Sequence, residues 1–351
     1  MAEIDSLLLK AKALKASDVH LTAAIPPKAR INGKLESMTD EPLTPARLQE
    51  LLLPILNTSA KERLEEFGEV DFSYAIIGEG RFRVNVFKQR GVYAAVLRLV
   101  GTQVPPADQL GIPNEVQELI YRKRGLVLVT GPTGSGKSTT LASLIDMMNR
   151  IRNCHIITLE DPIEYLHSHK EAVINQREIG MDSKNYAGAL RAALREDPDV
   201  ILLGEMRDLD TISTAITAAE TGHLVLSTLH TTGAAATIDR IIDVFPTGQQ
   251  QQIRLQLSNV LEAVISQQLL LNSEGNGRVA AFEVMFGSPA IRNLIRESKT
   301  HQINGLIQTS KKLGMELMDD SLYNLYMKNK ITKDTALSYA QDILSMQKRI
   351  Y

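Results

Sequence analysis

Closely spaced glycines, a lysine and a serine at residues 131–138 form the pattern of a phosphate-binding loop, Gly-Pro-Thr-Gly-Ser-Gly-Lys-Ser. The glycines let the backbone curl so that its N–H groups converge on phosphate oxygens. In this pattern Lys137 reaches the β- and γ-phosphates of a nucleotide, and the hydroxyl of Ser138 coordinates Mg²⁺. The sequence therefore predicts a site for ATP or GTP with Mg²⁺. The residues predicted to form it are Gly131, Pro132, Thr133, Gly134, Ser135, Gly136, Lys137, Ser138 and Thr139.

Such a loop needs a strand before it and a helix after it, and the sequence supplies both. Residues 126–129 are a wholly apolar run, Leu-Val-Leu-Val, which suits the interior of a parallel sheet. A helix is predicted from Lys137, because apolar residues then recur on one face at Leu141, Leu144, Ile145 and Met148. The N-terminus of that helix adds positive potential toward a bound phosphate.

Hydrolysis also needs a carboxylate that orients or deprotonates the attacking water. The apolar run 200–203 ends in Gly204-Glu205, where Asp-Glu is usual, so the Asp that normally supports Mg²⁺ is missing. Ligands of parallel sheets bind at the carboxyl ends of the strands, which is where Glu205 falls. Glu205 is therefore predicted to be the catalytic base or the residue that polarises the attacking water. A purely structural ion pair with Arg207 is the alternative.

A second acidic group follows the apolar run 155–159 and reads Glu160-Asp161-Pro162-Ile163-Glu164. Pro162 suits the first turn of a helix, with Asp161 as its cap. On such a helix Glu160 and Glu164 lie close together, which is unfavourable unless a cation lies between them. The pattern favours Glu164 as a ligand of Mg²⁺ or of its water. Simple capping is an equally good interpretation of Asp161.

Two histidines lie at opposite ends of one predicted strand within residues 221–230. His230 falls at the carboxyl end, beside the nucleotide, and is predicted to sense the γ-phosphate. His223 falls at the other end, where a structural role is equally plausible. No cysteine lies nearby, and the spacing does not favour a metal site.

Arginines in residues 81–98 are candidates for stabilising the γ-phosphate during transfer. In the predicted strand 81–86, Arg81, Arg83 and Asn85 share one face, while the apolar residues take the other. Arg98 ends the next predicted strand and can approach the same face. Arginines on a small sheet are more often only solvated, so Arg83 and Arg98 gain weight only from the resemblance described below.

Composition sets the class of protein. The 351 residues exceed what one compact core usually holds, so at least two domains are expected. The net charge of −2 does not favour a surface built for nucleic acid. Cys154 is the only cysteine, which excludes a disulfide or a four-cysteine zinc site within one chain. No apolar run approaches the roughly 18 residues of a membrane span, so a cytosolic protein is expected.

The hydrophobic pattern changes along the chain and predicts four segments. Residues 1–100 open with a helix and continue with strands, including a hairpin through Asn32-Gly33. Residues 101–113 contain three prolines and two glycines and read as a linker. Residues 114–285 alternate strands with helices, as parallel sheets do, with strands at 126–130, 155–159, 200–203 and 224–229. Residues 286–351 read as helices only.

Together these motifs resemble the secretion-type motor ATPases over nearly the whole chain. The shared motifs are the loop at 131–138, an Asp box at 159–164, the atypical Gly-Glu-Met-Arg-Asp at 204–208 and a His box at 221–230. Residues 290–295, Ala-Ile-Arg-Asn-Leu-Ile, match the hexapeptide of the pilus retraction branch. The alternative interpretation of this hexapeptide is that it packs as the apolar face of an ordinary helix. The extension and type II secretion branches usually carry a four-cysteine zinc element, and a single cysteine argues against both. Ser227 stands where relatives often have glycine, with little expected consequence.

The resemblance implies an α/β fold with a RecA-like ATPase core, a PAS-like α+β N-terminal domain and a helical C-terminal segment. It implies a homohexamer that hydrolyses ATP with Mg²⁺ and in which Arg83 and Arg98 engage the phosphates. Such a motor turns an inner-membrane platform protein and withdraws pilin subunits, acting from the cytoplasmic face of the membrane. It is peripheral to the membrane and binds no nucleic acid directly.

Three alternatives remain open at the level of sequence. An accessory retraction ATPase would act only in company with another motor. A nucleotide-gated assembly scaffold would bind ATP and hydrolyse it slowly; intact Lys137, Glu164 and Glu205 argue against it. A RecA-like nucleic-acid motor is disfavoured because the chain has no tryptophan and only 5% aromatic residues, whereas single-strand binders stack bases on aromatic side chains.

Overall fold

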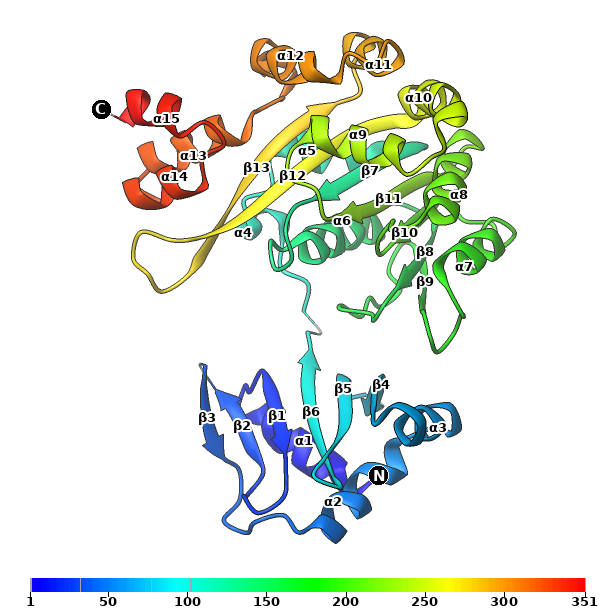
Figure 1. Ribbon diagram of the computed structural model, residues 1–351, viewed down its shortest axis with the longest axis vertical. Helices are drawn as coiled ribbons and strands as arrows, with labels where there is room; N and C mark the ends of the chain where they lie inside the picture. The colour runs from blue at the N-terminus through cyan, green and yellow to red at the C-terminus, as the bar shows by residue number, and fades with distance from the viewer. Residues whose placement is uncertain (1, 32, 77, 102, 351) are drawn as a thin grey trace. The chain divides into compact units, whose positions relative to one another are not determined.

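The computed structural model describes residues 2–31, 33–76, 78–101 and 103–350 (Figure 1). The chain divides into two compact units. The first comprises Met1–Gln103 with Glu164–Leu166, and the second comprises Val104–Ile163 with His167–Tyr351. None of the helices in the described ranges is long and apolar enough to cross a membrane.

An antiparallel sheet is the centre of the first unit. In the described part of this unit the strand order is β3-β2-β1-β6-β5-β4. Its core is formed by the apolar side of this sheet and by residues of three helices. The elements are α1 (Glu3–Ala13), β1 (Asp18–Leu21), β2 (Lys28–Ile31), β3 (Lys34–Ser37), α2 (Pro45–Leu52), η1 (Leu53–Ile55), α3 (Thr58–Phe67), β4 (Glu69–Ile76), β5 (Gly80–Gln89) and β6 (Val92–Val100).

The alternation predicted for residues 81–86 is confirmed in β5. Phe82, Val84 and Val86 are buried, whereas Arg83 is exposed on the opposite face. Strands β2 and β3 pair antiparallel with Ile31 opposite Lys34, as a hairpin requires. Of the predicted turn itself, Asn32 lies outside the described residues.

The second unit is built on a mixed sheet of strand order β13-β12-β7-β11-β10-β8-β9, counted over its described residues. Strands β12 and β13 pair antiparallel, and the other neighbouring pairs are parallel. The predicted strands at 126–130, 155–159, 200–203 and 224–229 are confirmed, and β9, β12 and β13 are additional. The strands are β7 (Gly125–Thr130), β8 (His155–Glu160), β9 (Val173–Glu178), β10 (Val200–Leu203), β11 (Leu224–Leu229), β12 (Leu261–Leu271) and β13 (Arg278–Phe286).

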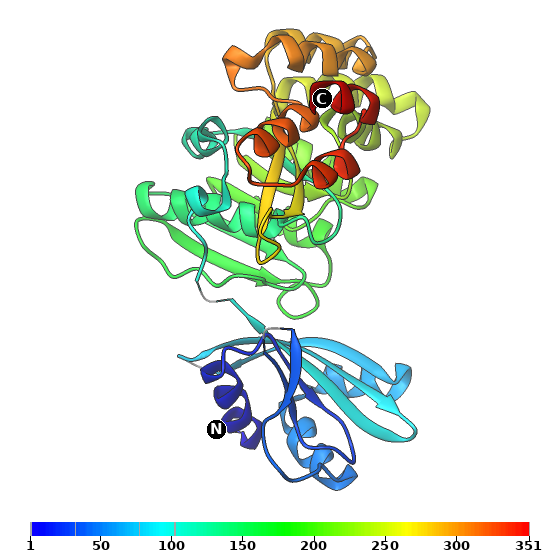
Figure 2. The ribbon, with the colours of Figure 1, turned by 90° about the vertical axis from the view of Figure 1, so that its left-hand side faces the viewer.

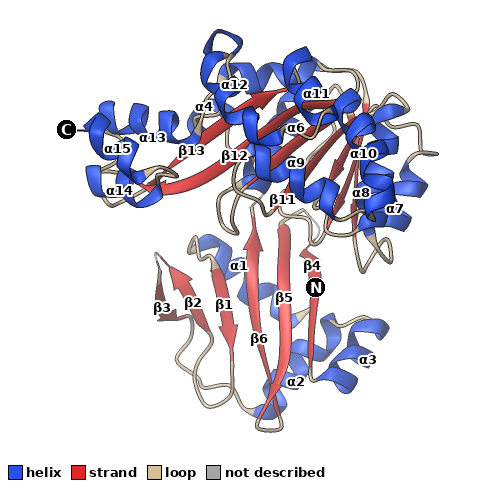
Figure 3. Cartoon of the chain, turned by 45° about the horizontal axis from the view of Figure 1, so that its top comes forward, coloured by secondary structure: helices blue, strands red, loops and turns tan. Residues whose placement is uncertain are grey.

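Helices cover both faces of this sheet, which explains why its central strands β7, β10 and β11 are buried along their whole length and mostly apolar (Figure 3). Leu126 and Leu128 of β7 face one hydrophobic core, shared with residues of α7 to α10. Val127 and Val129 face the other core, shared with α6. These helices are α6 (Lys137–Ile151), α7 (Tyr186–Ala193), α8 (Leu209–Glu220), α9 (Ala234–Asp243) and α10 (Thr247–Val260). The helix predicted from Lys137 is therefore confirmed as α6.

The stretch at 101–113 differs from a simple linker. From Val104 onward it belongs to the second unit, and Ala107–Leu110 form the short helix α4. Ala107 and Ile112 are buried in the core that faces α6, so apolar contact fixes this proline-rich segment in place. The next elements are α5 (Asn114–Gln117) and η2 (Glu118–Tyr121).

Helices follow β13 over the described residues up to 350. Three of them pack with Leu270 of β12 and Ala281 of β13 in a small separate core. Figure 2 shows these three, α13 to α15, beside the β12–β13 ribbon. The elements are α11 (Pro289–Arg296), η3 (Thr300–Gln302), α12 (Ile303–Thr309), η4 (Lys311–Leu313), α13 (Met318–Met327), α14 (Lys333–Tyr339) and α15 (Ile343–Ile350).

Candidate nucleotide site

The loop between β7 and α6 adopts a backbone that only glycine tolerates well. Gly131, Gly134 and Gly136 have φ of 141°, 81° and 89°. A Cβ on Gly131 would lie 2.2 Å from the carbonyl oxygen of Gln267, and one on Gly136 would lie 2.9 Å from Gln267 Nε2. The loop is therefore pressed against β12, and any other residue at 131 would push it away.

Gln267 supports the loop from behind and is not among the sequence-predicted residues. Only 3% of it is exposed, and its Oε1 accepts a hydrogen bond of 2.8 Å from Thr140 Oγ1 in the first turns of α6. Because its main chain and side chain also abut Gly131 and Gly136, Gln267 fixes both ends of the loop. The available signal is the polar group Ser266-Gln267-Gln268 between the apolar residues 263–265 and 269–271.

Lys137 is turned back onto its own loop. Its Nζ donates to the carbonyl oxygens of Gly131 at 2.8 Å and of Pro132 at 3.1 Å. The tip of the loop at 132–134 is exposed, while Ser138 and Thr139 are half-buried in the first turn of α6. Gly136 caps α6 without a side-chain hydrogen bond, so the first N–H groups of the helix suit an anion. These residues fit a phosphate, and Ser138 supplies the hydroxyl that Mg²⁺ would take.

The structure brings Glu205 and His230 together at the same edge of the sheet. They follow the neighbouring parallel strands β10 and β11, and His230 Nε2 lies 3.6 Å from Glu205 Oε2. Leu229 of β11 is paired with Thr130 of β7, which places His230 next to the start of the loop. Arg207 Nε also contacts Glu205 Oε2, at 2.7 Å. The ion pair between Glu205 and Arg207 therefore exists. Glu205 nevertheless also lies near His230 at the edge of the sheet where a nucleotide is expected.

Steric crowding explains why residue 204 is glycine and not aspartate. A Cβ at Gly204 would lie 2.8 Å from the hydroxyl oxygen of Tyr186 and 3.2 Å from the carbonyl oxygen of Leu159. Tyr186, the first residue of α7, thus fills the space that an aspartate would need. Burial raises the pKa of Tyr186, and the charges of nearby Asp161 and Glu205 raise it further, so the phenol stays protonated. The sequence pattern does not single out Tyr186.

The helix predicted at residues 161–164 is wrong. This segment is irregular and runs beside β9, because Ile163 N donates to Glu178 Oε2 at 3.0 Å and His167 N donates to Gln176 Oε1 at 2.8 Å. These contacts with β9 replace the hydrogen bonds of a helical turn, so the argument that placed Glu160 and Glu164 on one helix does not hold. Glu164 is exposed and is grouped with the first unit.

His223 has structural contacts that support its alternative reading. Its Nδ1 lies 2.9 Å from the carbonyl oxygen of Ala218, near the end of α8, and 3.2 Å from Thr221 Oγ1. It precedes β11 and so lies at the opposite end of that strand from His230.

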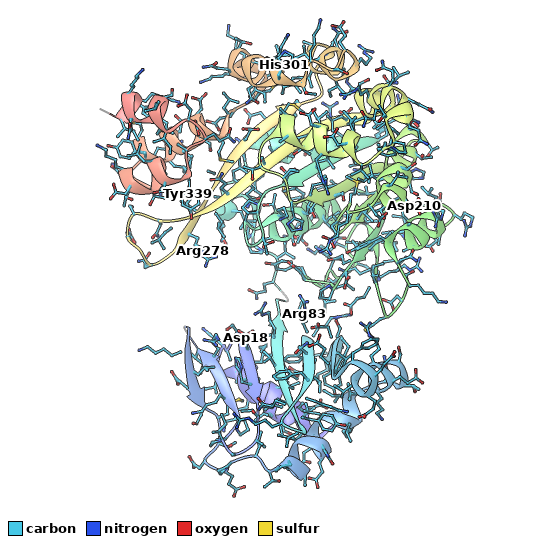
Figure 4. All side chains as sticks on the ribbon, viewed as in Figure 1. Asp18, Arg83, Asp210, Arg278, His301 and Tyr339 are labelled. Carbon is cyan, nitrogen blue, oxygen red and sulfur yellow. The ribbon has the colours of Figure 1, made fainter. Side chains whose placement is uncertain are left out.

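Arg83 and Arg98 of the first unit lie in one cross-strand row with Asp18. Arg83 of β5 is directly opposite Arg98 of β6, and Arg98 is directly opposite Asp18 of β1 (Figure 4 labels Asp18 and Arg83). Arg98 Nε contacts Asp18 Oδ1 at 2.8 Å, whereas Arg83 Nε lies 3.9 Å from Asp71 Oδ1. Each of the two arginines therefore has a carboxylate beside it, and their engagement of phosphate stays a prediction.

The hexapeptide at 290–295 forms most of α11, and its residues divide into two sets. Ile291 and Ile295 are fully buried, which confirms packing for these two. Arg292 is half-buried and tied to the sheet: its guanidinium donates to the carbonyl oxygens of Gly287 at 2.7 Å and Ser258 at 2.9 Å and to Glu262 Oε1 at 2.9 Å. The other residues, Ala290, Asn293 and Leu294, line a groove of about 400 Å³ shared with α12.

The fold and the site define a P-loop ATPase: a mainly parallel sheet, a glycine loop entering a helix, and a glutamate that follows a nearby strand of the same sheet. Residues 2–337 match the type II/IV secretion system protein family, and the chain belongs to it.

Similar proteins cover almost the whole chain. The type IV pilus retraction ATPase PilT of Pseudomonas aeruginosa is 48% identical over 339 residues, which are 97% of this chain and 98% of that protein. A twitching motility protein of Neisseria gonorrhoeae is 47% identical over 320 residues, 91% of this chain and 86% of that one. A crystal structure of the pilus retraction motor PilT with bound ADP superposes with a TM-score of 0.92 at 50% identity, covering 99% of this chain and 100% of that chain.

Proposed function

We propose that this ATPase is a hexameric motor that powers type IV pilus retraction, and with it pilus disassembly and twitching motility. The observation that carries the proposal is the end-to-end similarity to PilT together with an intact loop and Glu205. The motor would dock at the cytoplasmic face of the inner membrane on a pilus platform protein, with an accessory retraction ATPase as a further partner.

The positions of the site residues support the following proposed roles. Lys137 exchanges the carbonyl oxygens of Gly131 and Pro132 for the β- and γ-phosphates of ATP, and the loop N–H groups hold those phosphates. Ser138 supplies a ligand for Mg²⁺, which when bound neutralises charge on the phosphate oxygens. Glu205 orients and deprotonates the attacking water, and His230 beside it responds to the γ-phosphate.

The remaining roles come from the resemblance and are proposals of the same kind. Arg83 and Arg98 would stabilise the transferred phosphoryl group, and arginines in that role accelerate hydrolysis by about 10³ to 10⁵. A part for Glu164 beside Mg²⁺ or its water rests only on its place in the Asp box at 159–164, because the helix that argued for it is absent. Less than about tenfold loss in Arg83→Ala and Arg98→Ala would leave these arginines with no catalytic part.

The first experiment measures Mg-ATP turnover per subunit against protein concentration. Turnover should rise to a plateau as the ring assembles and vanish in Glu205→Gln, which should still bind ATP, whereas Lys137→Ala should lose productive binding. Wild-type and variant genes are then compared for restoring twitching to a strain that lacks its retraction motor. Tight ATP binding without turnover at any concentration would support the scaffold or the dependent accessory motor instead.

A further inference from the structure

One buried carboxylate caps two helices that belong to different parts of the second unit. Glu283, in the middle of β13, is only 1% exposed. Its Oε1 accepts a hydrogen bond of 2.7 Å from the N–H of Ala234, the first residue of α9. Its Oε2 accepts a hydrogen bond of 3.3 Å from the N–H of Met318, the first residue of α13.

Both helices depend on this carboxylate because neither has a cap of its own. The N-cap residues Gly233 and Leu317 make no side-chain capping hydrogen bond. The first N–H groups of a helix have no partner within the helix, and the helix dipole adds positive potential there. Glu283 therefore supplies to two helix starts the acceptor that Ser, Thr, Asp or Asn usually supplies to one.

Stability alone does not account for a carboxylate at this position. Burial raises the pKa of Glu283, and this effect outweighs the hydrogen bonds from Ala234 and Met318, which lower it. Folding therefore disfavours the ionised form of Glu283. As the pH rises and Glu283 ionises, the free energy of unfolding falls. A side chain retained at such a cost to stability is a candidate for a functional role.

The α9 end of this arrangement adjoins the site. Ala234 is four residues beyond His230, and the connecting turn is held from the same ribbon. Gly233 N donates to Ser266 Oγ at 3.0 Å, and Ser266 of β12 is the direct cross-strand partner of Glu283. The turn that carries His230 is therefore anchored at its far end by Ser266 and Glu283.

The α13 end reaches the C-terminal helices. The backbone of Glu316 is hydrogen-bonded in both directions to Val284, the residue after Glu283, at 2.8 and 3.0 Å. Met318 is fully buried in the small core that α13 shares with β12 and β13. Gln341, beyond α14, also hydrogen-bonds to Glu283. Displacing α13 from the ribbon thus removes hydrogen bonds from the same carboxylate that starts α9.

We propose that Glu283 is a positioning residue that sets His230 against Glu205, and that it makes this placement depend on the docking of α13 against β13. The inference rests on the proposed function, because it assigns His230 and Glu205 to hydrolysis. In this arrangement the C-terminal helices regulate turnover without touching the nucleotide.

The experiment uses the whole chain. One test changes Glu283, and the other changes Met318. Glu283→Gln keeps the shape but offers one oxygen in place of two, so one helix start loses its acceptor. Met318→Pro removes the N–H that Glu283 accepts, and proline is well tolerated at the first position of a helix. Met318→Ala is its matched control, because it too shortens the side chain but keeps the N–H. Thr332→Ala removes the cap of α14 and serves as the control for general loosening of the C-terminal helices.

Glu283→Gln should lower kcat by about 10- to 100-fold, the size of loss that a small misplacement of a catalytic group causes, with ATP affinity nearly unchanged. Met318→Pro should turn over more slowly than Met318→Ala, and hydrogen exchange at residues 231–237 should quicken in Met318→Pro but not in Thr332→Ala. Wild-type kcat per folded molecule in Glu283→Gln, or equal behaviour of the two Met318 variants, would overturn the inference. Should the wild type itself hydrolyse no ATP, the proposed function fails, while the hydrogen-exchange comparison still decides whether α13 controls the start of α9.

Discussion

The crowding at Gly204 predicts that even one added methyl group destabilises the second unit. Gly204 does not have positive φ, so the backbone tolerates alanine, and the penalty of Gly204→Ala comes from crowding of its Cβ, mainly by the Tyr186 hydroxyl at 2.8 Å. Overpacking of this kind costs about 1–3 kcal/mol. For a unit of this size each kcal/mol lowers the unfolding temperature by about 2–4 °C, so a fall of about 2–12 °C is expected.

A double-mutant cycle isolates the responsible contact. Tyr186→Phe removes the hydroxyl oxygen and leaves the ring, so Gly204→Ala should cost much less in the Tyr186→Phe background than in the wild type. Some penalty should persist there, because the carbonyl oxygen of Leu159 still lies 3.2 Å from the new Cβ. The expected coupling energy between the two sites is about 0.5–3 kcal/mol, as found for residues in contact.

The assay is thermal unfolding of the wild type, both single variants and the double variant. Gly248→Ala is the matched control: Gly248 lies in α10 with nothing within 4 Å of a Cβ, so alanine there should be neutral or stabilising. Equal losses from Gly204→Ala in the wild-type and Tyr186→Phe backgrounds would refute the steric account of the missing aspartate.

Three further outcomes are expected. Gln267→Ala leaves the buried Thr140 hydroxyl without its acceptor and loosens the loop, so the Kd for a fluorescent ATP analogue should rise at least fivefold, or about 1 kcal/mol; an unchanged Kd would remove Gln267 from the site. Burial raises the pKa of Asp18, but hydrogen bonds from Arg98 and Ser17 and the positive charge nearby together lower that pKa below its ordinary value. Its contribution to stability is therefore present at neutral pH and lost as the pH falls through the lowered pKa. Asp18→Asn should unfold at a lower temperature than wild type at pH 7, and this difference should shrink on acidification below the ordinary value of 3.8. In α11, Ile291→Ala should lose about 2–5 kcal/mol of stability, whereas exposed Asn293→Ala should unfold normally and impair twitching; the reverse pattern would contradict the division of the hexapeptide.

The central strands and the loop were predictable because their signals are local. A strand buried on both faces is rich in apolar residues, and the runs at 126–130, 200–203 and 224–229 fit that rule without reference to distant residues, with Thr130, Ser227 and Thr228 as their only polar members. Glu205 and His230 were also predictable as neighbours, since carboxyl ends of parallel strands meet at one edge of a sheet.

Strands β12 and β13 were not predictable, because they bury polar groups whose partners are far away in the sequence. Ser266 and Gln267 interrupt the apolar pattern of β12, yet both are satisfied by Gly233 and Thr140. Glu283 interrupts β13 in the same way. The false helix at 161–164 has the same origin: a good local capping pattern gave way to hydrogen bonds with Glu178 and Gln176.

These polar interruptions explain how one ribbon serves three features. The side chain of Gln267 supports the phosphate loop, while Ser266 and Glu283 anchor the turn after His230. At the other end of β12, Glu262 forms an ion pair with Arg292 of the hexapeptide. This ion pair connects α11 to the sheet. Each of these polar side chains of β12 and β13 makes a hydrogen bond or ion pair with a different element. A movement of the two strands is therefore expected to affect the phosphate loop, the turn after His230 and α11 together. Polar residues inside an otherwise apolar strand are thus a sequence signal that the strand holds other elements in place through hydrogen bonds.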